Sequence, residues 1–230
     1  MDLSTIRGAV KRRLGEPSAS DSGYWEDSDY TAEVNRGAEQ FAMETNCLKS
    51  YVDIETEDFN DTNGNLFDIS EDSLDDFKAV TEVHYYIGQD ADDSTLGSYT
   101  PLKKVSRKEM PYKQSENDNV TGVPSFYCYE DRIIELDVIP NDGDLIRIWY
   151  YRVPSADEGE AVSADADIPI IPEKYHEALV YWVCWKFSEG DELRSDRVAY
   201  YRDMWRAEIA KAKVTEAGSA SGYGRIRRVY

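Results

Sequence analysis

The chain is poor in the side chains on which most catalytic and metal sites are built. Its 230 residues include two histidines, His84 and His176, and three widely separated cysteines, Cys47, Cys128 and Cys184. A catalytic set based on histidine is therefore hard to assemble, and the cysteine spacing gives no zinc site. The sequence also contains no GxSxG, HExxH or glycine-rich phosphate-binding motif. We predict that the protein is not an enzyme and has no catalytic residues, cofactor or metal.

Long apolar runs and net positive charge are also missing. No segment approaches the roughly 18 apolar residues that a membrane span requires, and cations between Arg7 and Arg13 interrupt the region where a secretory signal would be apolar. The 46 Asp and Glu against 26 Lys and Arg give a net charge of -20, which disfavours ordinary nucleic-acid binding. This excess of acidic residues is expected of a surface past which DNA moves without binding. It is equally expected of a protein that is simply soluble or adapted to a saline habitat. We expect an intracellular product with no membrane partner.

Helical periodicity marks both ends of the chain. Leu3, Ile6, Val10 and Leu14 recur at helical spacing, and Gly15 follows where a helix-ending glycine would lie. A second helix is predicted to begin with Asp27 or Ser28 as its N-cap and to end near Asn46. Apolar residues at helical spacing near the C-terminal end predict two more helices, one from Tyr175 to Lys186 and one from Val198 to Ala212.

The middle of the chain has the pattern of strands. Strands are predicted over 51–56, 66–69 and 77–87, and three more over 125–129, 132–138 and 145–151. Turn residues at 130–131 and 140–144 predict that the last three form an antiparallel meander. Residues 88–121 are expected to be loops with a short helix or turn.

These patterns together predict an α+β fold. An α-helical bundle core is expected from residues 1–48 and 169–214, and an antiparallel β-sheet domain of residues 49–168 is inserted into it. Residues 215–230 are expected to form a flexible C-terminal tail, because they begin with a Gly- and Ser-rich stretch.

Several local features allow two interpretations. The oxygen-rich loop 58–65 suggests calcium, but it lacks the glycine that a calcium loop needs at its sharp turn, which favours a solvated hairpin tip. The basic groups at 7–13 and 225–228 either dock to an acidic partner or neighbouring copy, or are a solvated helix face and a free terminus. Two functional alternatives also stay open: a β-rich carbohydrate- or peptide-binding module using aromatics such as Trp149 or Tyr150, and a carboxylate-dependent hydrolase.

One set of segments resembles a known family. Residues 12–16, the run Tyr24-Trp25-Glu26-Asp27, and Asn35, Ala38 and Glu39 on the next predicted helix resemble the amino-terminal pattern of head-to-tail adaptor proteins of tailed bacteriophages, also called gp6-like connector or neck proteins. The segments 122–127, 167–179 and 200–205 are similar to later parts of that family. The resemblance covers most of residues 3–214 and depends on the order of several weak motifs.

The resemblance implies a place in the virion neck, with synthesis in the host cytoplasm. It implies a dodecameric ring beneath the portal protein, a DNA channel through which genomic DNA passes without specific binding, and a platform for the tail or nozzle protein. A C-terminal extension commonly grips the portal in this family. On this basis portal docking is assigned to Tyr223, Arg225, Ile226, Arg227, Arg228, Val229 and Tyr230.

Overall fold

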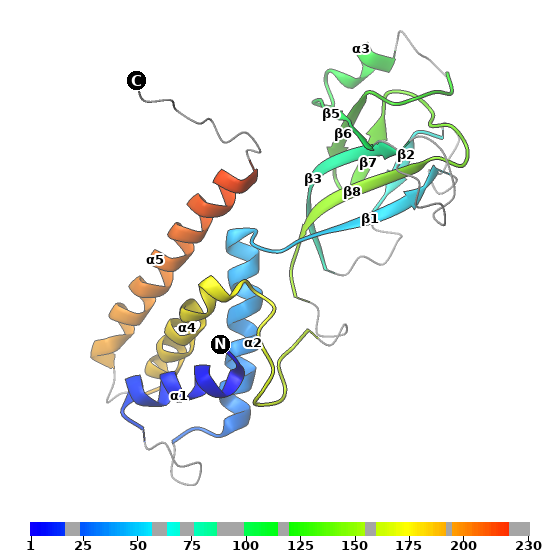
Figure 1. Cartoon of the computed structure of the whole chain (residues 1–230). Helices are drawn as coiled ribbons and strands as arrows, with labels where there is room; N and C mark the ends of the chain where they lie inside the picture. Colours follow the sequence, from blue (N-terminus) through cyan, green and yellow to red (C-terminus); the bar gives the residue numbers. More distant parts are fainter. Residues whose placement is uncertain are drawn as a thin grey trace, which may run out of the picture. The chain divides into compact units, whose positions relative to one another are not determined.

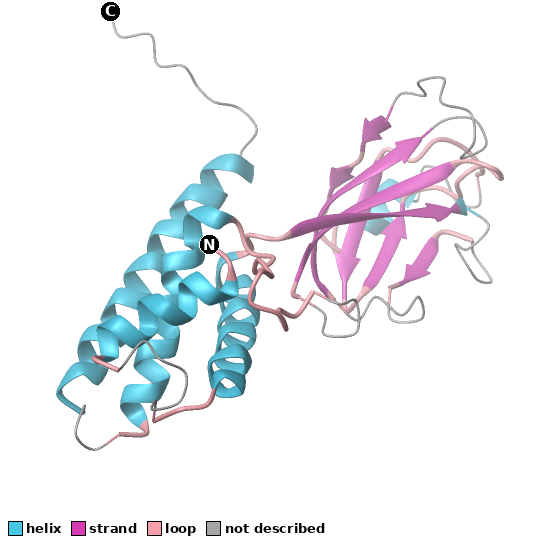
Figure 2. Cartoon of the chain, turned by 60° about the horizontal axis from the view of Figure 1, so that its bottom comes forward, coloured by secondary structure: helices cyan, strands magenta, loops and turns pink. Residues whose placement is uncertain are grey.

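The structure, a computed structural model, divides into two compact units. It describes residues 1–16, 24–56, 64–69, 76–86, 99–114, 120–154, 160–191 and 195–220. The helical unit comprises Met1–Leu48 with Arg152–Tyr230, and the β unit comprises Lys49–Tyr151. Figure 2 shows the helices of the first unit in cyan and the strands of the second in magenta. The predicted α+β class is confirmed.

The helical unit is built around one central helix. It contains α1 (Leu3–Leu14), α2 (Asp27–Thr45), the short 3-10 helix η2 (Glu173–Tyr175), α4 (His176–Glu189) and α5 (Ser195–Ala220). Helix α4 contacts α1, α2 and α5 and lies among them in Figure 1. Its buried side chains are His176, Ala178, Leu179, Val180, Val183, Cys184, Phe187 and Ser188. A helix buried around so much of its circumference needs neighbours on several sides, and α1 and α2 from the start of the chain supply two of them.

The ends of the helices follow local chemistry. Helix α1 ends at Gly15, whose φ of 72° is the left-handed conformation that glycine adopts without strain, and α2 ends at Asn46 with φ 58°. The predicted N-cap of α2 is wrong by a residue or two. Glu26 is the cap, because Glu26 and Asp29 form a capping box in which each side chain accepts a hydrogen bond from the other's backbone N–H.

The β unit consists of two four-stranded sheets and a short helix. Sheet A has the order β1-β8-β3-β4 and sheet B the order β2-β7-β6-β5. Their bounds are β1 (Lys49–Glu55), β2 (Leu66–Asp68), β3 (Phe77–Tyr86), β4 (Tyr99–Pro101), β5 (Lys103–Lys104), β6 (Phe126–Glu130), β7 (Ile133–Leu136) and β8 (Leu145–Arg152), with helix α3 (Met110–Gln114) between β5 and β6. Ile54, Val83 and Ile148 of sheet A share one buried cluster with Phe67, Tyr127 and Ile134 of sheet B. The two sheets therefore pack on a common core.

The predicted meander is wrong at its last strand. β6 and β7 form the antiparallel hairpin, turning at Asp131 and Arg132, which both have positive φ. β8, however, leaves that sheet and pairs with β1, with Val52 opposite Ile148. The edge of β7 that β8 would have used is occupied by β2, and the loop 140–144 is long enough to carry the chain to the other sheet. Residues 88–121 contain the expected short helix, α3, but also two strands that were not predicted, β4 and β5, and the β5–β6 pair is parallel.

One boundary of the units differs from the expected one. Residues 160–168, which the sequence analysis placed in the β-rich insertion, lie in the helical unit. The reason is a set of hydrogen bonds to α1 and α2, such as the pair between Asn35 and Val162. The predicted division of the chain into a helical core, an inserted β domain and a C-terminal tail stays a prediction. The oxygen-rich residues 58–63 and the tail residues 221–230 lie outside the described residues.

Two helical glycines give a direct test of the packing on α4. A Cβ added to Gly37 of α2 would lie 2.7 Å from Cδ1 of Trp182, whereas a Cβ on Gly8 of α1 would meet Arg12 Nη1 at an ordinary 3.6 Å. We expect Gly37→Ala to destabilise the protein by about 1–3 kcal/mol through overpacking. Gly8→Ala should stabilise it by about 0.5–1 kcal/mol, because alanine loses less backbone entropy in a helix. Urea unfolding of both variants measures these changes, and equal effects of the two would contradict the packing described.

Candidate functional site

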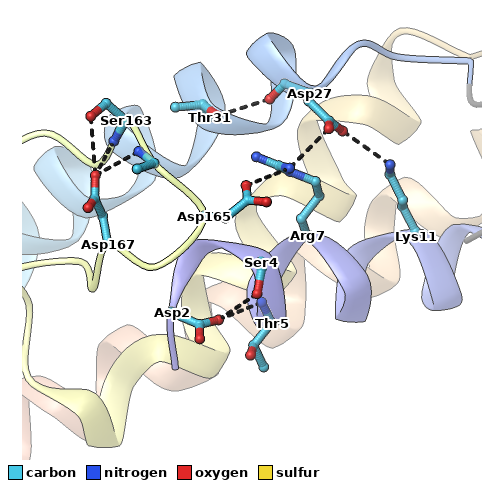
Figure 3. Close-up of polar contacts among 11 residues, drawn as sticks. Asp2, Ser4, Thr5, Arg7, Lys11, Asp27, Thr31, Ser163, Asp165 and Asp167 are labelled. Carbon is cyan, nitrogen blue, oxygen red and sulfur yellow. Dashed lines mark hydrogen bonds and ion pairs between the residues drawn. The ribbon is translucent and has the colours of Figure 1, made fainter. Parts of the chain in front are cut away.

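A joint between α1, the start of α2 and residues 160–167 holds the two ends of the chain together, and we call it the α1 joint (Figure 3). The backbone N–H of Leu3 donates to the carbonyl of Asp167 at 2.8 Å, and that of Ser4 donates to the carbonyl of Asp165 at 3.0 Å. The N–H groups of a helix's first turn have no partner inside the helix. Residues 160–167 therefore supply the carbonyl groups that accept hydrogen bonds from the N–H groups at the amino end of α1.

Charged side chains reinforce the same joint. Nη1 of Arg7 donates to Asp27 and to Asp165, each at 3.0 Å, and Nζ of Lys11 donates to the other oxygen of Asp27 at 3.2 Å (Figure 3). The two cations are nearly buried, with 12% and 8% of their side chains exposed, whereas Asp165 is 70% exposed. Arg13 further along α1 pairs with Glu177 of α4. Three cations of the basic group 7–13 are thus paired within the unit, which favours a structural role for them over docking to a partner.

Two polar turns set the geometry of the joint. The amide of Asn35 on α2 makes a reciprocal pair with the backbone of Val162, with distances of 3.0 and 2.9 Å. The carboxylate of Asp167 accepts hydrogen bonds from the backbone N–H groups of Ala164 and Ser163, both at 2.7 Å, and these lower its pKa. Asp2, the N-cap of α1, likewise accepts hydrogen bonds from Thr5 and Ser4, which lower its pKa.

An open cleft lies beside these contacts. It has a volume of about 560 Å³ and is lined by Arg7, Asp27, Ser28, Thr31, Ala32, Asn35, Val162, Ser163 and Asp165. Many of its polar groups bind one another in the pairs just given. The arrangement is thus suited to fastening three segments together.

This site was not predicted from the sequence. Residues 153–167 were assigned to the inserted β-sheet domain, and Asn35 entered only through the family resemblance. The partners Asn35 and Val162 are 127 residues apart, so no local pattern joins them. One local signal was present: a carboxylate four residues after Ser163 is typical of a turn in which it accepts backbone N–H bonds.

The histidines have structural partners. His176 is fully buried, and its Nε2 lies 2.8 Å from the carbonyl oxygen of Ile171, to which it donates. His84 lies 3.0 Å from Glu82 in the other unit. Burial raises the pKa of the Cys47 and Cys128 thiols. Within the described residues, no group of three His, Cys, Asp or Glu side chains could hold a metal ion, and none of the helices there could cross a membrane.

The aromatic pair proposed for a binding module is divided between two faces of sheet A. Tyr150 is buried in the core with only 4% of its surface exposed, and its hydroxyl donates to Asp76. Trp149 points to the opposite face and packs against Tyr51. Adjacent strand residues point to opposite faces, so this outcome could have been predicted from the alternation alone.

The seven residues assigned to portal docking, Tyr223 and Arg225 to Tyr230, lie outside the described residues. A family model described as the SU10 adaptor protein matches residues 1–228. The chain belongs to the SU10 adaptor protein family. The predicted resemblance to phage head-to-tail adaptors is thereby confirmed. A search of curated proteins found no match.

The SU10 adaptor match includes both the helical and the β units. It therefore includes every residue of the α1 joint, although these come from widely separated parts of the sequence. The joint is a candidate structural site of the adaptor, because it fixes the first helix of the chain to the segment that leads into the closing helices.

The lowered pKa of Asp167 predicts a pH-dependent stability. A carboxylate whose folded pKa lies below its ordinary value of 3.8 contributes stability above that pH and loses it as the pH falls through the folded pKa. Asp167→Asn should therefore lower the unfolding temperature at pH 6 to 7, and the difference from the natural chain should shrink below about pH 3.8.

Asp203→Asn is the matched control for this experiment. Asp203 is exposed on α5, and the substitution makes the same change in charge. Thermal unfolding between pH 2.5 and 7 should show no comparable pH-dependent difference for the control. A difference for Asp167→Asn that is constant across this range would contradict the role of its carboxylate.

Proposed function

We propose that this adaptor is a structural component of the neck of a tailed-phage virion and not an enzyme. It forms a ring, a dodecamer in our proposal, below the portal protein, extends the DNA channel and anchors the tail or nozzle. The family match over residues 1–228 is the observation that carries this proposal.

The surface of the helical unit supports assembly with other chains. Large apolar side chains are exposed there, with 76% of Tyr24, 57% of Tyr200 and 76% of Val214 accessible in the single chain. Contacts between ring subunits bury apolar area, and heterologous contacts close into a ring when the rotation between copies allows it.

The net charge supports the proposed channel. A chain of charge -20 repels the phosphates of DNA on average, so genomic DNA passes such a ring without specific binding. The tail has the opposite sign, because Arg225, Arg227 and Arg228 follow one another closely. We therefore retain portal docking for Tyr223, Arg225, Ile226, Arg227, Arg228, Val229 and Tyr230, since local charge contrast orients protein contacts.

Electron microscopy of the chain mixed with its portal protein tests this function. The natural chain should add a ring to the portal, and class averages should show twelve subunits. A chain that stays monomeric beside the portal at every salt concentration would contradict the adaptor role and favour a monomeric binding module.

A shortened chain tests the tail in the same assay. Ending the chain after Ala220 retains α5 and the bonds of Glu216 to Lys174 and Tyr175, so the helical unit stays intact. We expect this variant to need at least about tenfold more protein to saturate the portal. Replacing the three arginines with serine in the full-length chain separates charge from length. Unchanged portal association of the shortened chain would exclude the docking role.

A further inference from the structure

The β unit carries a dense group of cations, most of which form no ion pair within the described residues. Five of the 26 Lys and Arg residues lie between residues 103 and 113: Lys103, Lys104, Arg107, Lys108 and Lys113. The first four are exposed and Lys113 is half-buried. We call these five residues the 103–113 cluster. In a chain of net charge -20, such a concentration of positive charge is a distinct surface feature.

The fold gathers these cations at one edge of sheet B. β5, which contains Lys103 and Lys104, is the outermost strand beside β6. Nζ of Lys113 lies 4.6 Å from the centroid of the Phe126 ring on β6, and Nζ of Lys103 lies 6.0 Å from the same centroid. Nζ of Lys104 lies 5.7 Å from the centroid of the Tyr129 ring. The ring of Phe126 thus places Lys103 of β5 and Lys113 of α3 on one face of β6, whereas the ring of Tyr129 places Lys104 on the other face of the same sheet edge.

The charge of the cluster is compensated only in part. Arg107 pairs with Glu130 at 3.2 Å. The pKa of Glu109 is lowered chiefly by its hydrogen bonds with Ser106 and further by the charges of Lys103 and Lys113. Among the described residues, the four lysines form no ion pair with a carboxylate. The cations of α1 differ, because Arg7, Lys11 and Arg13 are all paired inside the helical unit. The 103–113 cluster is therefore available to an external anionic surface.

We propose that the 103–113 cluster binds carboxylates on a second copy of this chain in the assembled ring. The inference rests on the proposed function, because it requires the ring. Each copy carries 20 more carboxylates than cations, so neighbouring copies repel one another on average. A local positive surface against an acidic one offsets this repulsion and fixes the register of the two copies.

The same charges favour a protein partner over DNA. A duplex presents phosphates along its whole length, and the carboxylates near the cluster, among them Glu109, Glu130 and Asp131, would repel the adjoining phosphates. A protein contact of limited area brings the lysines alone against the partner's carboxylates. DNA binding is therefore an alternative outcome of the experiment.

Charge reversal with a matched control tests the proposal. The variant Lys103→Glu, Lys104→Glu, Lys108→Glu has a net charge of -26, since each of three reversals lowers the charge of -20 by two. Reversing Arg206, Lys211 and Lys213, which are exposed on α5, gives the same net charge. In the electron microscopy assay with the portal, we expect the first variant to need at least about tenfold more protein to complete a ring, and the control less than about threefold more.

Cross-linking of the natural chain gives a second measurement that needs no variant. A carbodiimide joins a lysine amine directly to a carboxylate, and a ring formed from equal amounts of ¹⁴N- and ¹⁵N-labelled chains distinguishes links between copies. Mixed-label links from Lys103, Lys104 or Lys108 to Asp or Glu are expected.

Each of the other outcomes contradicts the proposal in its own way. A natural chain that forms no ring overturns the proposed function and this inference together. A normal ring whose lysines link only within one copy or to the portal overturns the inference alone. Equal losses in the two variants assign the effect to net charge, and specific loss of duplex DNA binding with intact rings assigns the cluster to DNA.

Discussion

The burial of α4 is the constraint on which the rest of the structure depends. This helix carries apolar side chains around most of its circumference, with Leu179, Val183 and Cys184 fully buried. Such a helix is unstable in water until other helices cover it. Helix α5 follows it in the chain, but α1 and α2 come from the opposite end. The two ends must therefore meet, and residues 49–151 must leave and return between them.

The α1 joint shows how that meeting is fixed. The apolar contacts of α4 are non-directional, whereas the bonds from Leu3 and Ser4 to residues 165 and 167 have defined geometry. Arg7 joins α1 to both Asp27 and Asp165, so three segments are held by one side chain. In the proposed ring, a fixed helical unit keeps the surfaces that contact other proteins in place, and the 103–113 cluster of the β unit is the contact that we propose with a second copy.

The sequence predicted the features that depend on neighbouring residues. Local periodicity predicts helix α1, and the ability of glycine to adopt positive φ predicts its end at Gly15. The turn residues at 130–131 predict the β6–β7 hairpin. The pairing of β8 with β1 could not be predicted, because alternation fixes which face Ile148 points to but not which strand lies beside it. The α1 joint was missed for the same reason, since Asn35 and Val162 are distant in sequence. The family resemblance supplied the proposed function, which the residues alone left open between an assembly part, a binding module and a carboxylate-dependent hydrolase.

Hydrogen exchange measured by mass spectrometry on the intact chain tests the central claim, that both ends close over α4 as one cooperative body. Peptides from α1 and α2 should be protected from exchange to the same extent as those from α4. They should also lose protection together with α4 as denaturant is added, because the loss of either α1 or α2 exposes apolar side chains of α4. Exchange of residues 3–14 at the rate of an unfolded chain, while α4 stays protected, would contradict the account.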